Sequence, residues 1–258
     1  MVENHTKDRL ARGELALGVG LRQARTVDIG KIMKTAGFDW LFIDMEHNAM
    51  GIDIATQIAV AAQDAGITPL VRVPGHEPFH ASRALDGGAQ GIVVPHVNTA
   101  DEAAGAVAAC RYPPLGHRSM TGALPQIDFR SAPAGEAAVE LNEATLLVVM
   151  VETPAAVNNV DAIAATPGVD AVLIGTNDLC LEMGIPGEYG DPRVVSAYQA
   201  LVDACRAHGK YAGMGGIYQH DLLERYIGMG VQLVLTGSDL SFMLNGAKAQ
   251  ASAVRAMQ

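Results

Sequence analysis

The stretch Phe42-Ile43-Asp44-Met45-Glu46-His47 decides the fold prediction, because a short apolar run ends abruptly in two carboxylates and a histidine. Val148-Val149-Met150-Val151-Glu152 and Val172-Leu173-Ile174-Gly175-Thr176-Asn177-Asp178 repeat this design further along the chain. In a barrel of parallel strands, the carboxyl ends of the strands converge on one pocket, which is the usual place for catalysis. The repeated pattern therefore predicts a barrel whose pocket contains a histidine and several acids.

Short apolar runs alternate with longer segments of helix-like spacing along the whole chain. Eight strands are expected, near residues 15–20, 39–45, 68–74, 90–95, 145–152, 170–175, 210–215 and 231–236. The runs are continuously apolar, as the strands of a parallel sheet covered by helices must be. Eight βα units in about 250 residues match a (β/α)8 TIM barrel of the α/β class. The main alternative is a doubly wound sheet, but no GxGxxG follows the first strand.

Composition fits one soluble enzyme domain over residues 1–258, with 49% hydrophobic and 18% charged residues. A net charge of -10 without Lys/Arg runs argues against nucleic acid and anionic membranes as partners. The three cysteines, Cys110, Cys180 and Cys205, form no CxxC pair, which favours a reduced compartment. No signal-peptide pattern and no apolar run of about 18 residues is found. A cytoplasmic location is therefore expected.

One interval, residues 96–144, is longer than the other connections between strands. A helix is expected over 100–110, followed by Arg111-Tyr112-Pro113-Pro114-Leu115-Gly116-His117-Arg118-Ser119. Loops of this length in a compact domain are usually functional or disordered. Because this segment leaves the carboxyl end of the fourth strand, we expect a lid over the pocket or an element between subunits.

Glu152 and Asp178 end two neighbouring predicted strands. Adjacent strands lie about 5 Å apart, so the two carboxylates can bind one divalent cation. Oxygen ligands without a partnering cysteine or histidine pair favour Mg²⁺ or Mn²⁺. Each acid could instead cap the helix that follows it. Spacing alone supports the two interpretations equally, and they are compatible.

His47 and Arg72 are the other two candidates for chemistry. The acids beside His47 can orient and charge its imidazole, although a histidine after a strand can also be purely structural. Arg72 lies within an apolar strand, where an unpaired guanidinium is costly. It must therefore meet an anionic substrate or a carboxylate of the protein.

The remaining signals are weaker. The Gly175-Thr176-Asn177-Asp178 segment places main-chain N–H groups at a helix start, where anions bind. Asp86 lies in Leu85-Asp86-Gly87-Gly88-Ala89-Gln90-Gly91, which is by default a helix-to-strand turn at the surface. Cys180 is interpreted as a packing residue. The histidines without ligand spacing, interpreted as structural or exposed, are His76, His80, His96, His117, His208 and His220.

With these residues in place, the chain resembles the HpcH/HpaI family of class II, metal-dependent pyruvate aldolases. That family includes 2,4-dihydroxyhept-2-ene-1,7-dioate and 2-keto-3-deoxy-sugar-acid aldolases, and its fold is a phosphoenolpyruvate/pyruvate-domain-like TIM barrel. The resemblance extends from Ala36-Gly37-Phe38-Asp39 to Thr236-Gly237-Ser238-Asp239. Its specific marks, in order, are Ile43-Asp44-Met45-Glu46-His47, Val71-Arg72-Val73-Pro74, Gly88-Ala89-Gln90-Gly91-Ile92-Val93-Val94-Pro95, Arg111 to Ser119, Val151-Glu152-Thr153 and Gly175-Thr176-Asn177-Asp178-Leu179.

The resemblance implies a role for each matching residue. By the resemblance, His47 is the base, and Asp86 is the acid that raises the basicity of that histidine. Arg72 is the cation that stabilises the enolate, and Glu152 and Asp178 are the metal ligands. The expected substrate contacts are Gly175, Asn177 and Asp178. Two positions depart from the family. Met150 stands where the family usually has a substrate-binding Gln, and Gly18-Val19-Gly20-Leu21 lacks a Trp found in many members.

The implied activity is a lyase that reversibly cleaves a 4-hydroxy-2-oxo acid to pyruvate, or a close 2-oxo acid, and an aldehyde. The reaction passes through a metal-stabilised enolate, with Mg²⁺, Mn²⁺ or Co²⁺ as cofactor. No lysine stands at a strand end except Lys210, at the start of the seventh strand, which disfavours a Schiff-base mechanism. The alternatives are an oxaloacetate decarboxylase, a CoA-ester lyase and, in another class, a catalytically silent metabolite-binding barrel.

The resemblance also implies a homohexamer with helices exchanged between subunits. Asp86 ends the helix before the fourth strand, at the opposite end of the barrel from His47. Within one subunit the two residues should therefore lie far apart. Pairing them requires Asp86 from a neighbouring chain, so we expect active sites shared between subunits.

Overall fold

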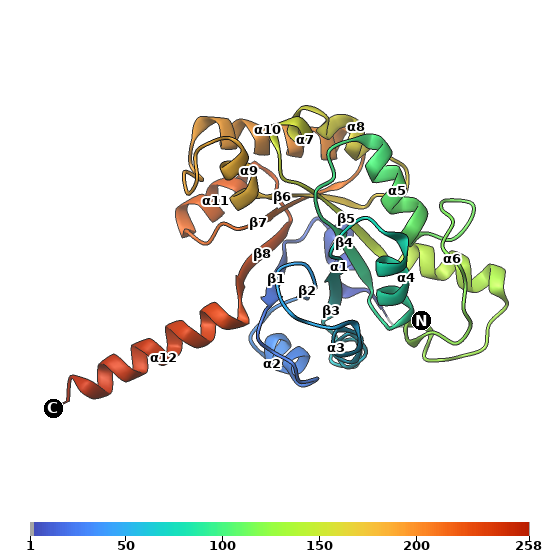
Figure 1. Cartoon of the computed structure of the whole chain (residues 1–258), viewed down its shortest axis with the longest axis horizontal. Helices are drawn as coiled ribbons and strands as arrows, with labels where there is room; N and C mark the ends of the chain where they lie inside the picture. Colours follow the sequence, from blue (N-terminus) through green and yellow to red (C-terminus); the bar gives the residue numbers. More distant parts are fainter. Residues whose placement is uncertain (1–2, 258) are drawn as a thin grey trace.

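A computed structural model of the chain describes residues 3–257. Its eight parallel strands form one closed barrel in the order β1 to β8 (Figure 1). The strands are β1 (Ala16–Leu21), β2 (Trp40–Asp44), β3 (Thr68–Arg72), β4 (Gly91–Val94), β5 (Leu146–Val151), β6 (Ala171–Gly175), β7 (Tyr211–Gly215) and β8 (Leu233–Ser238). The TIM-barrel prediction is confirmed, and each expected strand overlaps an observed one.

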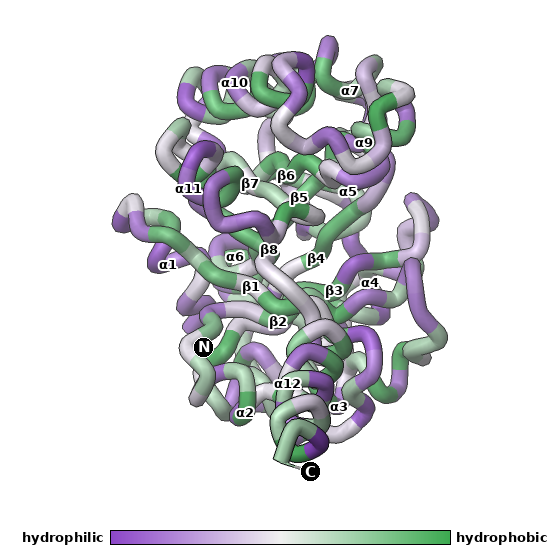
Figure 2. The backbone as a smooth tube through the Cα atoms, turned by 90° about the vertical axis from the view of Figure 1, so that its left-hand side faces the viewer, coloured by the Kyte–Doolittle hydropathy of each residue, from purple (hydrophilic) through white to green (hydrophobic). Residues whose placement is uncertain are grey.

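The described residues form the following helices, most of which surround the barrel on its outer side. They are α1 (His5–Ala11), α2 (Ile29–Thr35), α3 (Ile52–Asp64), α4 (Pro78–Asp86), α5 (Ala100–Cys110), η1 (Pro125–Ile127), α6 (Ala134–Ala144), α7 (Pro154–Asn158), α8 (Val160–Ala165), α9 (Thr176–Glu182), α10 (Pro192–Ala207), α11 (His220–Met229) and α12 (Asp239–Arg255). The apolar strands occupy the centre in Figure 2, whereas the outer helices alternate apolar and polar residues. Helices cover the outer face of the strands and side chains fill the inside of the barrel, so both faces of each strand are buried and apolar.

The interior of the barrel is packed with side chains. Trp40 is fully buried there, and its indole N–H donates to the Ala16 carbonyl at 3.2 Å. A Cβ atom at Gly18 would lie 2.1 Å from the Trp40 ring, so only glycine leaves room for it. Leu10 of α1 belongs to the same apolar cluster and closes the amino-terminal end of the barrel.

The segment after α5 does not cover the pocket of its own chain, so the expectation of a lid is wrong. The helix α5 returns to the amino-terminal end of the barrel, and the segment stays there. Gln126 donates to the Leu85 and Ala89 carbonyls at 2.6 and 2.8 Å, which fixes η1 beneath α4. Asn142 of α6 exchanges hydrogen bonds with the backbone of Tyr112 at 2.8 and 3.1 Å, which holds α6 to the segment just after α5.

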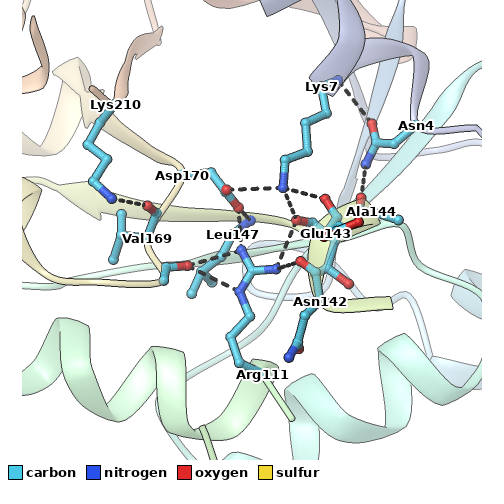
Figure 3. Close-up of polar contacts among 12 residues, drawn as sticks. Asn4, Lys7, Arg111, Asn142, Glu143, Ala144, Leu147, Val169, Asp170 and Lys210 are labelled. Atoms are coloured by element: carbon cyan, nitrogen blue, oxygen red, sulfur yellow. Dashed lines mark hydrogen bonds and ion pairs between the residues drawn. The ribbon is translucent and has the colours of Figure 1, made fainter. Parts of the chain in front are cut away.

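A buried ionic network holds this segment to the barrel (Figure 3). Arg111 pairs with Asp170 and donates to the Asn142, Thr145 and Gly168 carbonyls. Asp170 also lies 3.2 Å from Lys7 Nζ and accepts from the Leu147 N–H at 2.7 Å. One guanidinium therefore joins α5, α6 and the turn before β6.

The last helix, α12, departs from the barrel and projects away from it to the C-terminus (Figure 1). Exposed apolar side chains along it are Phe242, Met243, Leu244 and Val254. Among residues 3–257, no helix is long and apolar enough to cross a membrane. The three cysteines are buried and free of disulfide bonds.

Replacing Arg111 tests the ionic network. Arg111→Met should lower the free energy of unfolding by about 3 kcal/mol, because buried acceptors lose their donor. Urea denaturation followed by circular dichroism measures the loss. Arg193→Met is the matched control, since the Arg193 side chain is 55% exposed in its ion pair with Asp191, and its denaturation midpoint should stay almost unchanged. Equal effects of the two substitutions would contradict a structural role of the network.

Candidate active site

A pocket opens at the carboxyl ends of the strands. It contains six of the residues predicted from the sequence, namely His47, Arg72, Met150, Gly175, Asn177 and Asp178. The other lining residues are Gly20, Arg22, Phe42, Asp44, Thr176, Gly215, Gly216, Tyr218, Leu235, Gly237 and Ser238. Residues at the carboxyl ends of β1, β2, β3, β5, β6, β7 and β8 thus meet at one place, as the fold requires.

Arg72 is held by carboxylates of the protein at the wall of this pocket. Its Nε and Nη2 donate to the two oxygens of Asp44 at 3.0 and 2.7 Å, which is a bidentate pair. Its Nη1 lies 2.8 Å from Glu46 Oε2, although the angle is not that of a hydrogen bond. Asp44 is the register partner of Arg72 on the adjacent strand. The internal salt bridge considered for Arg72 therefore exists, and the guanidinium also reaches the pocket.

Asp44 organises the turn that carries His47. Its Oδ1 accepts from the backbone N–H groups of Glu46 and His47 at 3.1 and 3.2 Å. Burial opposes the charge of Asp44, but the Arg72 guanidinium outweighs it and lowers the pKa of Asp44. The His47 ring is half-exposed, with Nε2 3.8 Å from Glu46 Oε2. This turn places an imidazole at the mouth of the pocket, next to a carboxylate.

Glu152 is almost fully buried, and its two oxygens differ. Oε2 accepts from the backbone N–H of His96 at 2.8 Å and lies 3.1 Å from His96 Nδ1. Oε1 is buried without a hydrogen-bond partner. Burial raises the pKa of Glu152, and the nearby charges of Asp178 and Glu46 raise it further.

The capping interpretation of Glu152 and Asp178 is wrong. Thr153 caps α7, and its hydroxyl accepts from the Ala156 N–H. Asp178 lies within the first turn of α9, which has no side-chain cap. Neither carboxylate is therefore needed to start a helix.

The unpartnered oxygen of Glu152 and the carboxylate of Asp178 suit a divalent cation. They extend from adjacent strand ends, and hard cations prefer oxygen ligands. A Cβ atom at Gly175 would lie 2.6 Å from Glu152 Oε1, so glycine keeps the space beside this oxygen open. A buried carboxylate oxygen without a donor is costly, and a cation would remove that cost.

His96 is the site residue that sequence reasoning missed. Its Nε2 lies 2.9 Å from Glu46 Oε1, so the ring connects Glu46 to Glu152. The residue has a φ of 54°, an uncommon backbone conformation in which histidine is enriched. The signal was its position at the carboxyl end of β4, directly after Pro95, rather than any spacing to another ligand.

Asp86 does not lie on the wall of the pocket that contains His47. Its Oδ1 accepts from Arg118 Nη2 at 2.6 Å, and the Arg118 guanidinium lies 4.6 Å from the centre of the Tyr112 ring. Arg118 is buried, whereas the Asp86 side chain is 37% exposed. The sequence predicted that Asp86 and His47 lie apart within one chain, and the structure of the chain agrees.

Comparisons with known proteins identify the family of this chain. The family model described as HpcH/HpaI aldolase/citrate lyase matches residues 23–246. The chain is 37% identical over 260 residues to a 4-hydroxy-4-methyl-2-oxoglutarate aldolase of Hapsidospora irregularis, covering 99% of this chain and 96% of that protein. It is 38% identical over 219 residues to a hydroxypyruvate/pyruvate aldolase of Chromohalobacter salexigens, covering 84% and 85%.

A solved structure is similar over nearly the whole chain. The HpcH/HpaI aldolase from Desulfitobacterium hafniense DCB-2 superposes with a TM-score of 0.91 at 29% sequence identity. The match covers 96% of each chain.

Two glycines of the pocket provide a matched test of the cation site. Gly175→Ala should displace the Glu152 carboxylate and abolish Mn²⁺ binding, measured by calorimetry or electron paramagnetic resonance. Gly215→Ala should bind Mn²⁺ normally, because its Cβ atom would meet only ordinary contacts, the nearest at 3.5 Å. Undiminished Mn²⁺ binding by Gly175→Ala would rule out Glu152 Oε1 as a ligand.

Proposed function

This chain belongs to the HpcH/HpaI aldolase/citrate lyase family, and we propose that it works as a metal-dependent aldolase. The reaction is the reversible cleavage of a 4-hydroxy-2-oxo acid to pyruvate, or a close 2-oxo acid, and an aldehyde. Two relatives named as aldolases match 99% and 84% of the chain and support a carbon–carbon lyase. The observation that carries the metal-dependent mechanism is the buried, unpartnered Oε1 of Glu152. Glu152 is not among the lining residues of the pocket, but this oxygen lies directly beside Gly175, which lines it.

Glu152 and Asp178 are the proposed ligands of Mg²⁺, Mn²⁺ or Co²⁺. When bound, such a cation acts as a Lewis acid on the 2-oxo group of the substrate. Glu152 Oε2 already accepts a hydrogen bond from the backbone N–H of His96, whereas Oε1 has no partner and is the oxygen proposed for the cation. Two protein ligands leave further positions open for the substrate.

His47 is the proposed base. It takes the proton of the C4 hydroxyl, and a carbonyl forms at C4 as the C3–C4 bond breaks. The bonding electrons move to C3 and onto the 2-oxo oxygen, and protonation at C3 then gives pyruvate. The Glu46 carboxylate lies 3.8 Å from His47 Nε2, at the side of the imidazole ring that would carry out this step.

Arg72 is the proposed cation for the negative charge that develops on the substrate. Asp44 and Glu46 fix the guanidinium, so it needs little reorganisation during the reaction. N–H groups that these carboxylates do not use remain for the substrate oxygen. A fixed donor of this kind typically contributes about 10²–10³ in rate.

The substrate contacts implied by the family lie on the opposite wall of the pocket. The backbone at Gly175, Asn177 and Asp178 is proposed to hold the pyruvate carboxylate. Met150 lines the pocket at the position usually occupied by Gln, together with Phe42 and Leu235. This chain therefore offers an apolar surface where relatives offer an amide.

Two alternative activities share this chemistry, and a third alternative is not an enzyme. An oxaloacetate decarboxylase or a CoA-ester lyase would use the same cation and Arg72. A silent metabolite-binding barrel is disfavoured, because it has no need for His47, Arg72, Glu152 and Asp178 in one site.

Completion of the site by a neighbouring subunit is also proposed. Asp86 is half-exposed and does not line the His47 pocket of its own chain. The projecting α12 exposes Phe242, Met243 and Leu244, which supports exchange of this helix between subunits. The proposed assembly is a homohexamer in which Asp86 of one subunit pairs with His47 of another.

Removal of the metal tests the mechanism. Chelator-treated protein should lose pyruvate release from 4-hydroxy-2-oxo acids and regain it with Mg²⁺, Mn²⁺ or Co²⁺. Lactate dehydrogenase coupled to NADH oxidation measures the pyruvate. Full activity of metal-free protein would refute the role of Glu152 and Asp178.

Subunit complementation tests the shared site. His47→Ala and Asp86→Asn should each be nearly inactive, and mixing them should restore activity by forming sites with both residues intact. Exchange is first verified by mass spectrometry of the mixed oligomers. The control mixes His47→Ala with Glu152→Gln. These two residues come from the same subunit in the proposed site, so no mixed site has both intact and no activity should be restored. No recovery in the first mixture would reject the His47–Asp86 pair.

A further inference from the structure

Arg22 is a cation at the pocket that the mechanism above does not use. It follows β1 directly, is exposed, and lines the same pocket as Arg72 and Asp178. Arg72 is neutralised by Asp44 and Glu46. Within the part of the chain that the structure describes, the Arg22 guanidinium has no ion pair, so its charge is available to a ligand.

The backbone of Arg22 is held in place by a buried acid. The Asp239 carboxylate accepts from the N–H groups of Arg22, Gln23 and Ala24 at 2.9, 2.8 and 2.6 Å. Asp239 is only 8% exposed. The Arg25 guanidinium donates to the Arg22 and Ala24 carbonyls at 3.0 and 2.9 Å, which fixes the turn from its other side. The base of the Arg22 side chain is therefore preorganised at the mouth.

Arg22 lies across the barrel from the proposed cation site. In the closed strand order, β1 is opposite β5, which carries Glu152 at its end. A substrate whose 2-oxo acid end lay at Glu152 and Asp178 could extend its other end across the barrel toward β1 and β2. Arg22 follows β1, and two further polar side chains of the pocket, Ser238 and Tyr218, come from β8 and from the loop after β7.

Tyr218 supports a polar contact at this place. Tyr218 lines the same pocket as Arg22, and its side chain is 53% exposed. Its phenol can donate a hydrogen bond to a ligand in the pocket. A guanidinium beside a hydroxyl donor is suited to a carboxylate.

We propose that Arg22 is a specificity-determining residue: its guanidinium binds a carboxylate at the far end of the substrate, so that this chain favours a 4-hydroxy-2-oxo dicarboxylate over the matching monocarboxylate. Cleavage then yields pyruvate and a carbonyl compound that itself bears a carboxylate. The inference rests on the proposed aldolase function for the orientation of the substrate. Asp44 and Asp178 also line the pocket, and their negative charges repel a substrate that carries two carboxylates. The positive charge of Arg22, added to that of Arg72, offsets this repulsion.

Two substrates that differ only at the far end test the assignment. The C5 carboxylate of 4-hydroxy-2-oxoglutarate is replaced by a methyl group in 4-hydroxy-2-oxopentanoate. Arg22→Gln should lower kcat/KM for the dicarboxylate by about 10- to 100-fold, the usual range for a charged hydrogen bond. It should change kcat/KM for the monocarboxylate by less than about twofold. Equal losses on both substrates, or no loss on either, would overturn the proposal.

The control substitution is Lys31→Gln, which removes the same charge from an exposed position on α2 outside the pocket. It should leave both substrates unaffected. Circular dichroism should show both variants folded, because only backbone N–H groups of residue 22 bind Asp239. If Lys31→Gln reproduces the Arg22→Gln effect, net charge rather than a contact is responsible, and the proposal fails.

Binding of uncleavable analogues separates this inference from the proposed function. 2-Oxoglutarate and 2-oxopentanoate lack the C4 hydroxyl, so their affinities, measured by calorimetry with Mn²⁺ present, do not depend on catalysis. Wild-type protein should bind 2-oxoglutarate more tightly, and Arg22→Gln should abolish the difference. No pyruvate from either substrate would refute the aldolase function, whereas equal wild-type affinity for the two analogues would refute the role of Arg22.

Discussion

The bidentate pair between Asp44 and Arg72 is the interaction on which the rest of the site depends. A buried guanidinium and a buried carboxylate are tolerated only as partners, and register between β2 and β3 brings them together. The same carboxylate accepts from the N–H groups of Glu46 and His47. One acid therefore fixes the position of the proposed base and of the proposed electrostatic stabiliser.

The surplus of negative charge in the pocket is the second constraint. Burial raises the pKa of Glu152, and Asp178 and Glu46 contribute to the shift. His96 lies 3.1 Å from Oε2 of Glu152, and Gly175 leaves space beside Oε1. This arrangement is unfavourable for the protein alone and becomes favourable when a cation binds, which is typical of a functional site.

The two ends of the barrel are specialised for different tasks. At the amino-terminal end, the Arg111 network and α1 fix the long segment before β5. At the carboxyl end, polar side chains face an open pocket. Asp239 links this pocket to α12, because the residue that begins the projecting helix also holds the turn of Arg22. Docking of α12 on another subunit would thus be coupled to the mouth of the pocket.

The sequence by itself determined the barrel and most of the proposed site. Continuously apolar runs indicate strands that are buried on both faces. Polar residues at the ends of these runs indicate the carboxyl ends of the strands, so His47, Arg72 and Asp178 were found without coordinates. The sequence did not reveal His96 or the course of the segment after α5. The contacts of His96 depend on which strand ends become neighbours when the barrel closes. The course of the later segment depends on the end of the barrel at which α5 terminates. Only tertiary structure decides this, because contacts such as Glu46 with His96 join residues that no local spacing relates.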